Sequence, residues 1–431
     1  MHYIYMNNFR GFNKTLLPVS TVTFLIGENS TGKSSFLKIL KHLYQPDFWM
    51  RGDFDLHEES GFGGFNDVVS AWSTDKTFFQ VGVMKIVKDS KGKITQNFSS
   101  LVFRDEDGLP KLSRYFNKGK DQEISFNFSQ EGMTYGINEV ESSFATEQEA
   151  INNFLLALDN ELLTSKNTMK FPKGFPSRLP LPIAITVAKS LNKNKTGLDF
   201  ENEMVFASDI TWIAPIRSKP LRTYDGLKRR FSPEGDHAPH VLRKSLENGN
   251  ETSEFPKKLE KFGESSGLFE TVIAHSFGNE PQSPFELLIK FNDVNININN
   301  VGYGVSQVLP LIVDFISADK GKHFAVQQPE VHLHPRAQAA LGDLVFSLAK
   351  EKKHSFLIET HSDYLIDRFR LACRKDKSAA KVDAQVIFFS RVPTGNNAVA
   401  IKIGSDGTYP KSTPKDFRDF FIKEEIKLLD I

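Results

Sequence analysis

Near the N-terminus, a run of apolar residues typical of a strand is followed by apolar residues at helical spacing. The run Thr21–Ile26 is apolar and rich in β-branched residues, which predicts a buried strand that ends at Gly27. A glycine-bounded loop comes next, and after it apolar residues recur at helical spacing on one face: Phe36, Leu37, Leu40, Leu43 and Tyr44. The pattern therefore predicts a strand–loop–helix unit.

In the middle of the chain the spacing of apolar residues changes from helical to strand-like. Between Phe78 and Ile137 short β-rich runs are separated by turn signals at 90–92, Asp107-Gly108 and Glu131-Gly132, which predicts an antiparallel meander. Helical spacing returns at 147–163. The proline-rich stretch 171–182 predicts a loop, and 218–285 is charged and turn-rich, with short helices expected.

The last third alternates between strand and helix. Helices are predicted at 306–317, 335–352, 363–373 and 416–429, and strands at 323–327, 355–360, 385–392 and 397–403. In the first of these helices the apolar residues share one face: Val305, Val308, Leu309, Ile312, Val313 and Ile316. Regular β–α alternation predicts an α/β fold with a mainly parallel sheet that is covered on both faces.

Composition narrows the class of protein. The 431 residues carry 54 Lys+Arg and 53 Asp+Glu, so the chain is not a strongly basic nucleic-acid wrapper. Cys373 is the single cysteine, which excludes an internal disulfide and a cysteine metal cluster. The first residues lack the apolar core of a signal peptide, and the chain contains no apolar run long enough to span a membrane. We therefore expect a cytoplasmic protein.

The loop after the first strand carries the most specific motif. Gly27-Glu28-Asn29-Ser30-Thr31-Gly32-Lys33-Ser34 fits G-x-x-x-x-G-K-[ST]. Glycines let backbone N–H groups turn toward phosphate oxygens, and the helix that follows directs its positive dipole end at them. Lys33 would reach the β- and γ-phosphates, and the Ser34 hydroxyl would bind Mg²⁺. The motif predicts nucleotide binding.

A second polar segment follows the strand at 323–327. Strand tips of this kind in phosphate-loop ATPases carry an acid for the Mg²⁺ shell and a neighbour that polarises the attacking water. Here Gln327 and Gln328 occupy both places. His332 and His334 have the i, i+2 spacing of a metal pair, but no third ligand is evident, and a turn-stabilising pair is the preferred interpretation.

These segments together resemble a known family. With Val301-Gly302-Tyr303-Gly304-Val305-Ser306-Gln307 and Glu359-Thr360-His361-Ser362, they look like the ATPase heads of the ABC superfamily. The branch is that of chromosome-maintenance and RecF-type proteins, whose first strand and turn resemble Asn8-Phe9-Arg10-Gly11-Phe12. QPEVHLHP and THSDYLIDRFR are especially similar to compact ATPases of bacterial anti-phage systems, including the OLD type.

The resemblance implies roles for individual residues. Ser306 would open a helix and bind the γ-phosphate held by a second subunit, with Gln307 beside it, and His361 would be the switch histidine that contacts the γ-phosphate. Arg217 and Arg222 resemble a recurrent arginine pair, and a structural role for them stays open. The expected nucleotide-binding set is Arg10, Gly27, Glu28, Asn29, Ser30, Thr31, Gly32, Lys33, Ser34, Ser35, Ser306 and Gln307.

The sequence departs from the family at one expected site. Relatives normally carry Asp or Glu at position 327, and Gln327 keeps the shape of the acid but removes its charge. The chain is then either a natural protein that binds ATP and hydrolyses it poorly, or an engineered Glu→Gln variant that traps ATP. Glu330 remains nearby as a carboxylate that could act as base. The expected catalytic set is Gln327, Gln328, Glu330 and His361.

The resemblance covers about 1–110 and 205–431. It implies an ABC-type head with an antiparallel β lobe, formed by residues 1–110 and 206–431, and a β/helical insertion at 111–205. The expected function is an ATPase that uses ATP and Mg²⁺, forms a homodimer or higher oligomer across ATP, and controls a separate effector, a nuclease or toxin from a neighbouring gene.

Three other functions are compatible with an ATPase head. A DNA-repair ATPase that binds DNA directly stays open, because basic clusters occur at 228–230, 243–244, 257–261 and 374–375. A fused nuclease is disfavoured, because too few residues follow His361 and they contain no D-x-D. A transporter motor is disfavoured by the different signature and the large insertion.

Overall fold

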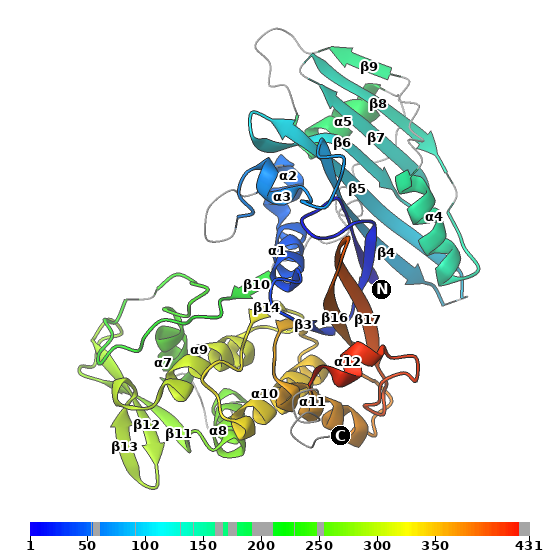
Figure 1. Ribbon diagram of the computed structural model, residues 1–431. Coiled ribbons are helices and arrows are strands. Elements are labelled where there is room, and N and C mark those ends of the chain that lie inside the picture. Colours follow the sequence, from blue (N-terminus) through cyan, green and yellow to red (C-terminus); the bar gives the residue numbers. More distant parts are fainter. Residues whose placement is uncertain are drawn as a thin grey trace. The chain divides into compact units, whose positions relative to one another are not determined.

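The structure is a computed structural model that describes residues 1–52, 54, 61–90, 92–129, 131–140, 142–159, 167–170, 179–191, 210–227, 229–247 and 254–421 (Figure 1). The chain divides into two compact units that are interleaved in sequence. Unit 1 comprises Met1–Ser20, Glu28–Asp209 and Phe389–Val399, and unit 2 comprises Thr21–Gly27, Ile210–Phe388 and Ala400–Ile431.

Unit 1 is built on an eight-stranded sheet in the order β2-β1-β4-β5-β6-β7-β8-β9, and every pairing in it is antiparallel. The strands are β1 (His2–Asn7), β2 (Thr15–Val19), β4 (Phe78–Lys88), β5 (Ile94–Glu106), β6 (Leu109–Lys118), β7 (Gln122–Ser129), β8 (Gly132–Glu139) and β9 (Asn167–Lys170). The consecutive strands β4 to β8 pair antiparallel, with Asp107-Gly108 between β5 and β6, which confirms the predicted meander.

Helices accompany this sheet. They are α1 (Lys33–Tyr44), α2 (Pro46–Arg51), α3 (Phe65–Val68), α4 (Glu147–Asp159) and α5 (Leu181–Leu191). Phe154 of α4 packs edge-on against Tyr5 and Phe98 of the sheet, with ring centroids 6.0 and 4.8 Å away. Phenylalanine is abundant in the chain, and Phe54, Phe79 and Phe103 form part of a second aromatic core in this unit.

Unit 2 contains a largely parallel sheet in the order β10-β14-β15-β3-β16-β17. The strands are β10 (Ile210–Ile213), β14 (His323–Gln327), β15 (Ser355–Glu359), β3 (Val22–Gly27), β16 (Ala384–Val392) and β17 (Gly395–Ile403). The pairings of β10 with β14, β14 with β15, and β15 with β3 are parallel. The central strands are buried on both faces, as a parallel sheet requires.

The helices of unit 2 pack on this sheet and on each other. They are α7 (Ala238–Glu247), α8 (Glu254–Ser266), α9 (Tyr303–Ser317), α10 (Pro335–Glu351), α11 (Asp363–Lys375) and α12 (Lys415–Phe420), with a short η1 (Ile298–Asn300) before α9. Phe315 of α9 contacts Phe324 and Phe356 on the sheet, and Phe369 of α11 contacts Phe24. The predicted apolar face of α9 is buried.

The sequence predictions of regular structure are largely confirmed, and the structure adds elements that were not predicted, among them β2, β9, β10, α2 and α3. α9 begins at Tyr303, three residues before the predicted start. A three-stranded antiparallel sheet in unit 2, made of β11 (Thr271–Ser276), β12 (Phe285–Phe291) and β13 (Val294–Asn297), was not predicted. α5 was not predicted either, and its first residues lie in the expected loop 171–182, of which 171–178 are outside the described residues. The described part of the C-terminal helix ends at Phe420, and no described helix is long and apolar enough to cross a membrane.

Candidate functional site

The glycine-bounded loop forms an arc between β3 and α1. Ser30 has a φ of 61° and Gly32 a φ of 97°, so the backbone turns through the left-handed region twice. The Thr31 hydroxyl and the Lys33 ammonium each donate to the carbonyl oxygen of Glu28, at 2.7 Å in both cases. These bonds hold the arc, while Glu28, Asn29 and Ser30 stay exposed.

The first turn of α1 faces this arc. Its N-cap is Gly32, which supplies no side-chain acceptor for the free N–H groups of the helix. Uncapped N–H groups beside a turned loop are suited to bind an anion. Ser34 lies in this first turn and is partly exposed, as a hydroxyl that binds a metal must be.

Arg10 is brought to the same turn by a strained backbone position. Its φ of 48° directs the side chain toward Ser35, whose hydroxyl accepts from Nη1 at 3.3 Å, and toward the Phe62 carbonyl, which accepts from Nη2 at 3.2 Å. The guanidinium also lies 5.0 Å from the Phe62 ring centroid. Burial lowers the pKa of Arg10, and the Asp67 carboxylate opposes that shift. The structure thus places Arg10, an expected nucleotide-binding residue, against the first turn of α1 within unit 1.

In unit 2, the polar residues after β14 and β15 meet at the carboxyl edge of the sheet. Gln327 and Glu359 are register partners, and the Gln327 amide Nε2 donates to Glu359 Oε2 at 3.0 Å. The backbone N–H of Gln328 donates to the Glu359 carbonyl at 2.7 Å. Glu359 is buried, with 5% of its surface exposed. A carboxylate therefore does lie at this edge, on the strand beside the expected one.

The Glu330 side chain makes hydrogen bonds to the turn after β15 and not to Gln327. Its carboxylate accepts from the Thr360 hydroxyl at 2.8 Å and from the His361 backbone N–H at 2.7 Å. These bonds connect the turn after β14 to the turn after β15. His361 itself is exposed. Both carboxylate oxygens of Glu330 therefore accept hydrogen bonds from the turn after β15.

The two histidines of this turn have separate structural partners. His334 is the N-cap of α10, and its Nδ1 accepts from the Ala337 N–H at 3.3 Å. His332 has a φ of 66°, and its ring lies 5.7 Å from the Tyr303 ring. Among the described residues no group of three or more His, Cys, Asp or Glu could hold a metal ion. These contacts support the turn-stabilising interpretation.

The signature segment differs from its predicted geometry. Ser306 does not open a helix, because α9 begins at Tyr303 with Gly302 as N-cap, and Ser306 lies one turn inside. Its hydroxyl donates to the Tyr303 carbonyl at 3.1 Å, and the residue is only 4% exposed. The accessible start of the helix is instead Gly302 and Tyr303.

Gln307 fixes the position of Arg217. The Gln307 amide accepts from the Arg217 N–H at 3.1 Å and donates to the Arg217 carbonyl at 3.2 Å. Arg217 is 3% exposed, and none of its three guanidinium nitrogens has a hydrogen-bond partner. Burial lowers its pKa to about 10, and the Glu330 carboxylate opposes that shift. An orphaned buried cation is costly and favours an anion nearby. Arg222 is exposed.

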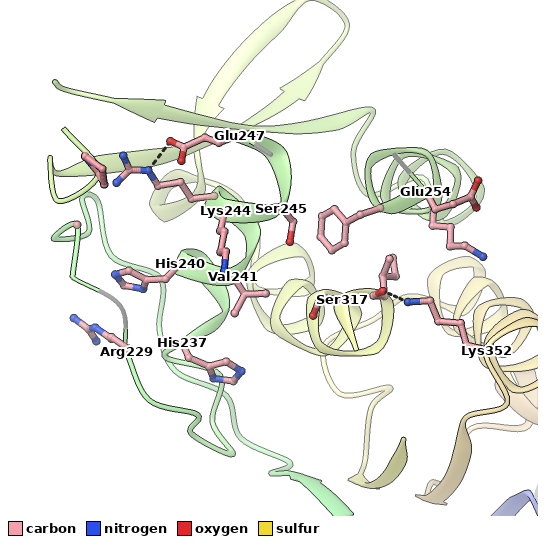
Figure 2. A pocket seen from close by; sticks show the side chains of 16 residues that line it. Arg229, His237, His240, Val241, Lys244, Ser245, Glu247, Glu254, Ser317 and Lys352 are labelled. Atoms are coloured by element: carbon pink, nitrogen blue, oxygen red, sulfur yellow. Dashed lines mark hydrogen bonds and ion pairs between the residues drawn. The ribbon is translucent and has the colours of Figure 1, made fainter. Parts of the chain in front are cut away.

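A separate cavity of about 730 Å³ lies in unit 2 (Figure 2). Figure 2 shows Arg229, His237 and His240 on one side, Glu254 and Lys352 opposite, and Lys244 and Ser245 between them. The wall is rich in basic residues, but several are already neutralised.

The partners of these basic groups lie within unit 2. Arg243 pairs with Glu247 at 2.7 Å, Lys258 pairs with Glu351, and Lys352 donates to the Ile316 and Ala318 carbonyls. Within the predicted basic clusters, Arg243 and Lys258 thus have carboxylate partners. Lys228 of the first cluster lies outside the described residues.

The turned glycine loop follows β3, which pairs in parallel with β15, and precedes the uncapped helix α1; this succession defines a phosphate-loop protein. Residues 1–366 match the family model described as AAA ATPase domain, and this chain belongs to that family. The ATPase class predicted from the motifs is confirmed.

Solved structures of low sequence identity are similar to the chain. They include the SMC head domain from Thermotoga maritima, at 11% identity and a TM-score of 0.38, covering 92% of this chain and 97% of that one. The Pyrococcus furiosus Smc head domain with an extended coiled coil, bound to the C-terminal domain of ScpA, shows 15% identity and a TM-score of 0.40, covering 99% and 100%. The recombination mediator RecF shows 12% identity and a TM-score of 0.29, covering 93% and 97%. No curated protein matches the chain.

Proposed function

We propose that this protein binds ATP with Mg²⁺ at the phosphate loop and acts as an ATP-dependent switch with slow turnover. The proposal is supported chiefly by the phosphate loop. Gly32 and Ser30 turn its backbone, and the Lys33 ammonium donates to the Glu28 carbonyl. The accessible loop backbone and the uncapped start of α1 are suited to a polyphosphate.

The loop also offers a ligand for the metal. The Ser34 hydroxyl is an oxygen donor, which Mg²⁺ prefers. When bound, Mg²⁺ neutralises charge on the β- and γ-phosphates.

The side chains of the chain then have distinct tasks. Lys33 binds phosphate oxygens, and Arg10 and Ser35 support the first turn of α1. The Gln328 amide orients water, as a neutral glutamine does in some GTPases. His361 is exposed and available for the γ-phosphate. Because Gln327 and Gln328 are both neutral, we expect slow hydrolysis and a long-lived ATP-bound state.

We also propose that two copies associate around ATP. The exposed N-terminus of α9 at Gly302 and Tyr303 supports this, since a free helix start favours a phosphate presented by a partner. Ser306 would act from inside the first turns by fixing the Tyr303 carbonyl.

The associated state would control a separate effector, a nuclease or a toxin, in anti-phage defence. The support is the likeness of QPEVHLHP and THSDYLIDRFR to compact defence ATPases. The alternative, direct DNA repair, is less favoured because Arg243 and Lys258 of the basic clusters already pair with carboxylates. Co-purification with the neighbouring gene product, followed by mass measurement with and without ATP, tests the choice. ATP hydrolysis that rises on adding DNA would favour repair.

Lys33→Ala tests the nucleotide site. ATP affinity measured by calorimetry should fall by about 100-fold or more, because a charged donor to phosphate is lost. Lys41→Ala, on the same helix but outside the motif, is the matched control. Equal affinities in both variants would remove the phosphate-loop assignment.

A further inference from the structure

The cavity shown in Figure 2 lies within unit 2, and none of its wall residues belongs to the phosphate loop. Its volume of about 730 Å³ is in the range that encloses a small organic molecule. The wall has five basic residues and two acidic ones, which leaves an excess of positive charge. They are Arg229, Arg243, Lys244, Lys258 and Lys352 against Glu247 and Glu254.

One of these basic side chains differs from the others in its partners. Arg243 and Lys258 form ion pairs with carboxylates, and Arg229 lies 4.0 Å from Asp225. In the part of the chain that the structure describes, the Lys244 ammonium makes no hydrogen bond and no ion pair. Lys244 is exposed, and Figure 2 shows it between the two sides of the cavity. Its charge is therefore free to meet a ligand.

Two hydroxyl groups line the same cavity. Ser245 follows Lys244 on α7, and Ser317 is the last residue of α9. Among the described residues neither hydroxyl has a hydrogen-bond partner. An ammonium and two hydroxyls are donors that a phosphate group accepts from.

Lys352 adds a second positive charge on the other side of the cavity (Figure 2). Its ammonium donates to the Ile316 and Ala318 carbonyls, at 2.5 and 2.8 Å, and one of its three donors remains. Burial lowers the pKa of Lys352, and the Lys258 ammonium lowers it further, while nearby carboxylates oppose the shift. Two ammonium groups this close to each other favour an anion beside them.

The remainder of the wall is suited to the organic part of a ligand. Apolar side chains come from Val241, Phe255, Pro281 and Ile316. The exposed Glu254 carboxylate has no ion pair with any described residue, and it can accept from a hydroxyl or amino group. Apolar walls with a few converging polar groups are typical of small-molecule sites.

We propose that this cavity binds a small organic phosphate, of the size and polarity of a nucleoside monophosphate. Lys244, Ser245 and Ser317 would donate to its phosphate, and the apolar side chains would contact its base. An inorganic anion would leave the apolar wall without a contact, and a nucleic-acid strand is too extended for a cavity of this volume. The site is separate from the phosphate loop and does not depend on the proposed ATP switch.

The test measures AMP affinity by calorimetry in the full chain that carries Lys33→Ala. This variant removes the phosphate-loop lysine, so that AMP binding reports on another site. AMP should bind to it as to the wild type. Adding Lys244→Met should weaken AMP roughly tenfold or more, because a charge-assisted hydrogen bond is lost.

Two further variants make the result specific to the cavity. Lys257→Met is the matched control, because Lys257 is an exposed lysine of α8 that does not line the cavity, and it should bind AMP normally. Ser317→Trp fills the cavity from an exposed position and keeps every charge. It should abolish AMP binding, with thermal unfolding confirming that each variant is folded.

Two other probes test the class of ligand. Inorganic phosphate should bind roughly tenfold more weakly than AMP, because it cannot bury apolar surface. A short DNA single strand should not displace AMP.

The proposal is overturned if Lys33→Ala binds no AMP, or if Lys244→Met and Lys257→Met lose affinity equally. Inorganic phosphate that binds as tightly as AMP would reduce the cavity to an unspecific anion site. DNA that displaces AMP would assign the cavity to a nucleic-acid strand. Failure of the ATP switch would instead appear as a wild type that binds no ATP, with AMP binding in Lys33→Ala unaffected.

Discussion

The phosphate loop of unit 1 and the strand edge of unit 2 are specified in different ways. In the loop, backbone conformation provides the site, and it depends on a few residues at fixed spacing, such as Gly32 and Lys33. At the strand edge, the site would depend on which side chains the register of two strands brings together, as Gln327 and Glu359 illustrate. A motif therefore predicts the first kind of site better than the second.

After the loss expected for Lys33→Ala, the next largest effect comes from disturbing the loop backbone. Gly32→Ala would strain a φ of 97° and place a Cβ 2.5 Å from the Phe12 ring. The strain alone costs about 1–2 kcal/mol, and the clash adds to it. ATP affinity should fall more than tenfold in calorimetry. Gly108→Ala, with a φ of 80° and nothing within 4 Å, should bind ATP normally. If ATP affinity falls equally in both variants, the loss comes from backbone strain in general and not from the shape of the phosphate loop.

A smaller effect is expected at the orphaned cation. Arg217→Met keeps the length of the side chain and removes its charge. If the guanidinium meets the terminal phosphate, ATP affinity should fall about tenfold while ADP affinity stays unchanged, since a charge-assisted hydrogen bond is worth about 1.5–3 kcal/mol. The exposed Arg222→Met is the control. If the affinities for ATP and ADP fall equally, Arg217 has a structural role and does not contact the terminal phosphate.

Association around ATP should depend on the exposed start of α9. At Gly302 an added Cβ meets nothing within 4 Å, so Gly302→Arg leaves its own subunit intact. Ser306→Arg is a poorer test, because Ser306 is buried. Sedimentation should show that Gly302→Arg loses ATP-dependent association but still binds ATP. Val294→Arg, at another exposed site, should associate. Association that survives in Gly302→Arg would contradict the composite site.

The smallest expected effect is on stability and concerns His354, a buried residue just before β15. Burial and the Lys352 ammonium lower the pKa of His354 to about 4 from its ordinary 6.5. The folded state therefore resists protonation, so stability is full above pH 6.5 and falls as the pH drops toward 4.

Urea unfolding at pH 7 and pH 5 measures this dependence. The loss should approach about 1.4 kcal/mol per pH unit between the two pKa values. His354→Asn should flatten the dependence, and the half-exposed His275→Asn should not. An unchanged slope in His354→Asn would assign the acid sensitivity to other groups.

The sequence by itself determined the regular elements and the phosphate loop, because helical and strand periodicity and the glycine spacing are local properties. It placed β3, α1, β14, α10, β15 and α11 close to their observed bounds. Tertiary structure decided the rest. Tyr303, not Ser306, begins α9, and only the register of β14 and β15 places Glu359 against Gln327. Only the tertiary structure shows that the buried guanidinium of Arg217 makes no hydrogen bond. These facts depend on residues far apart in the chain, and local spacing does not encode strand register or side-chain burial.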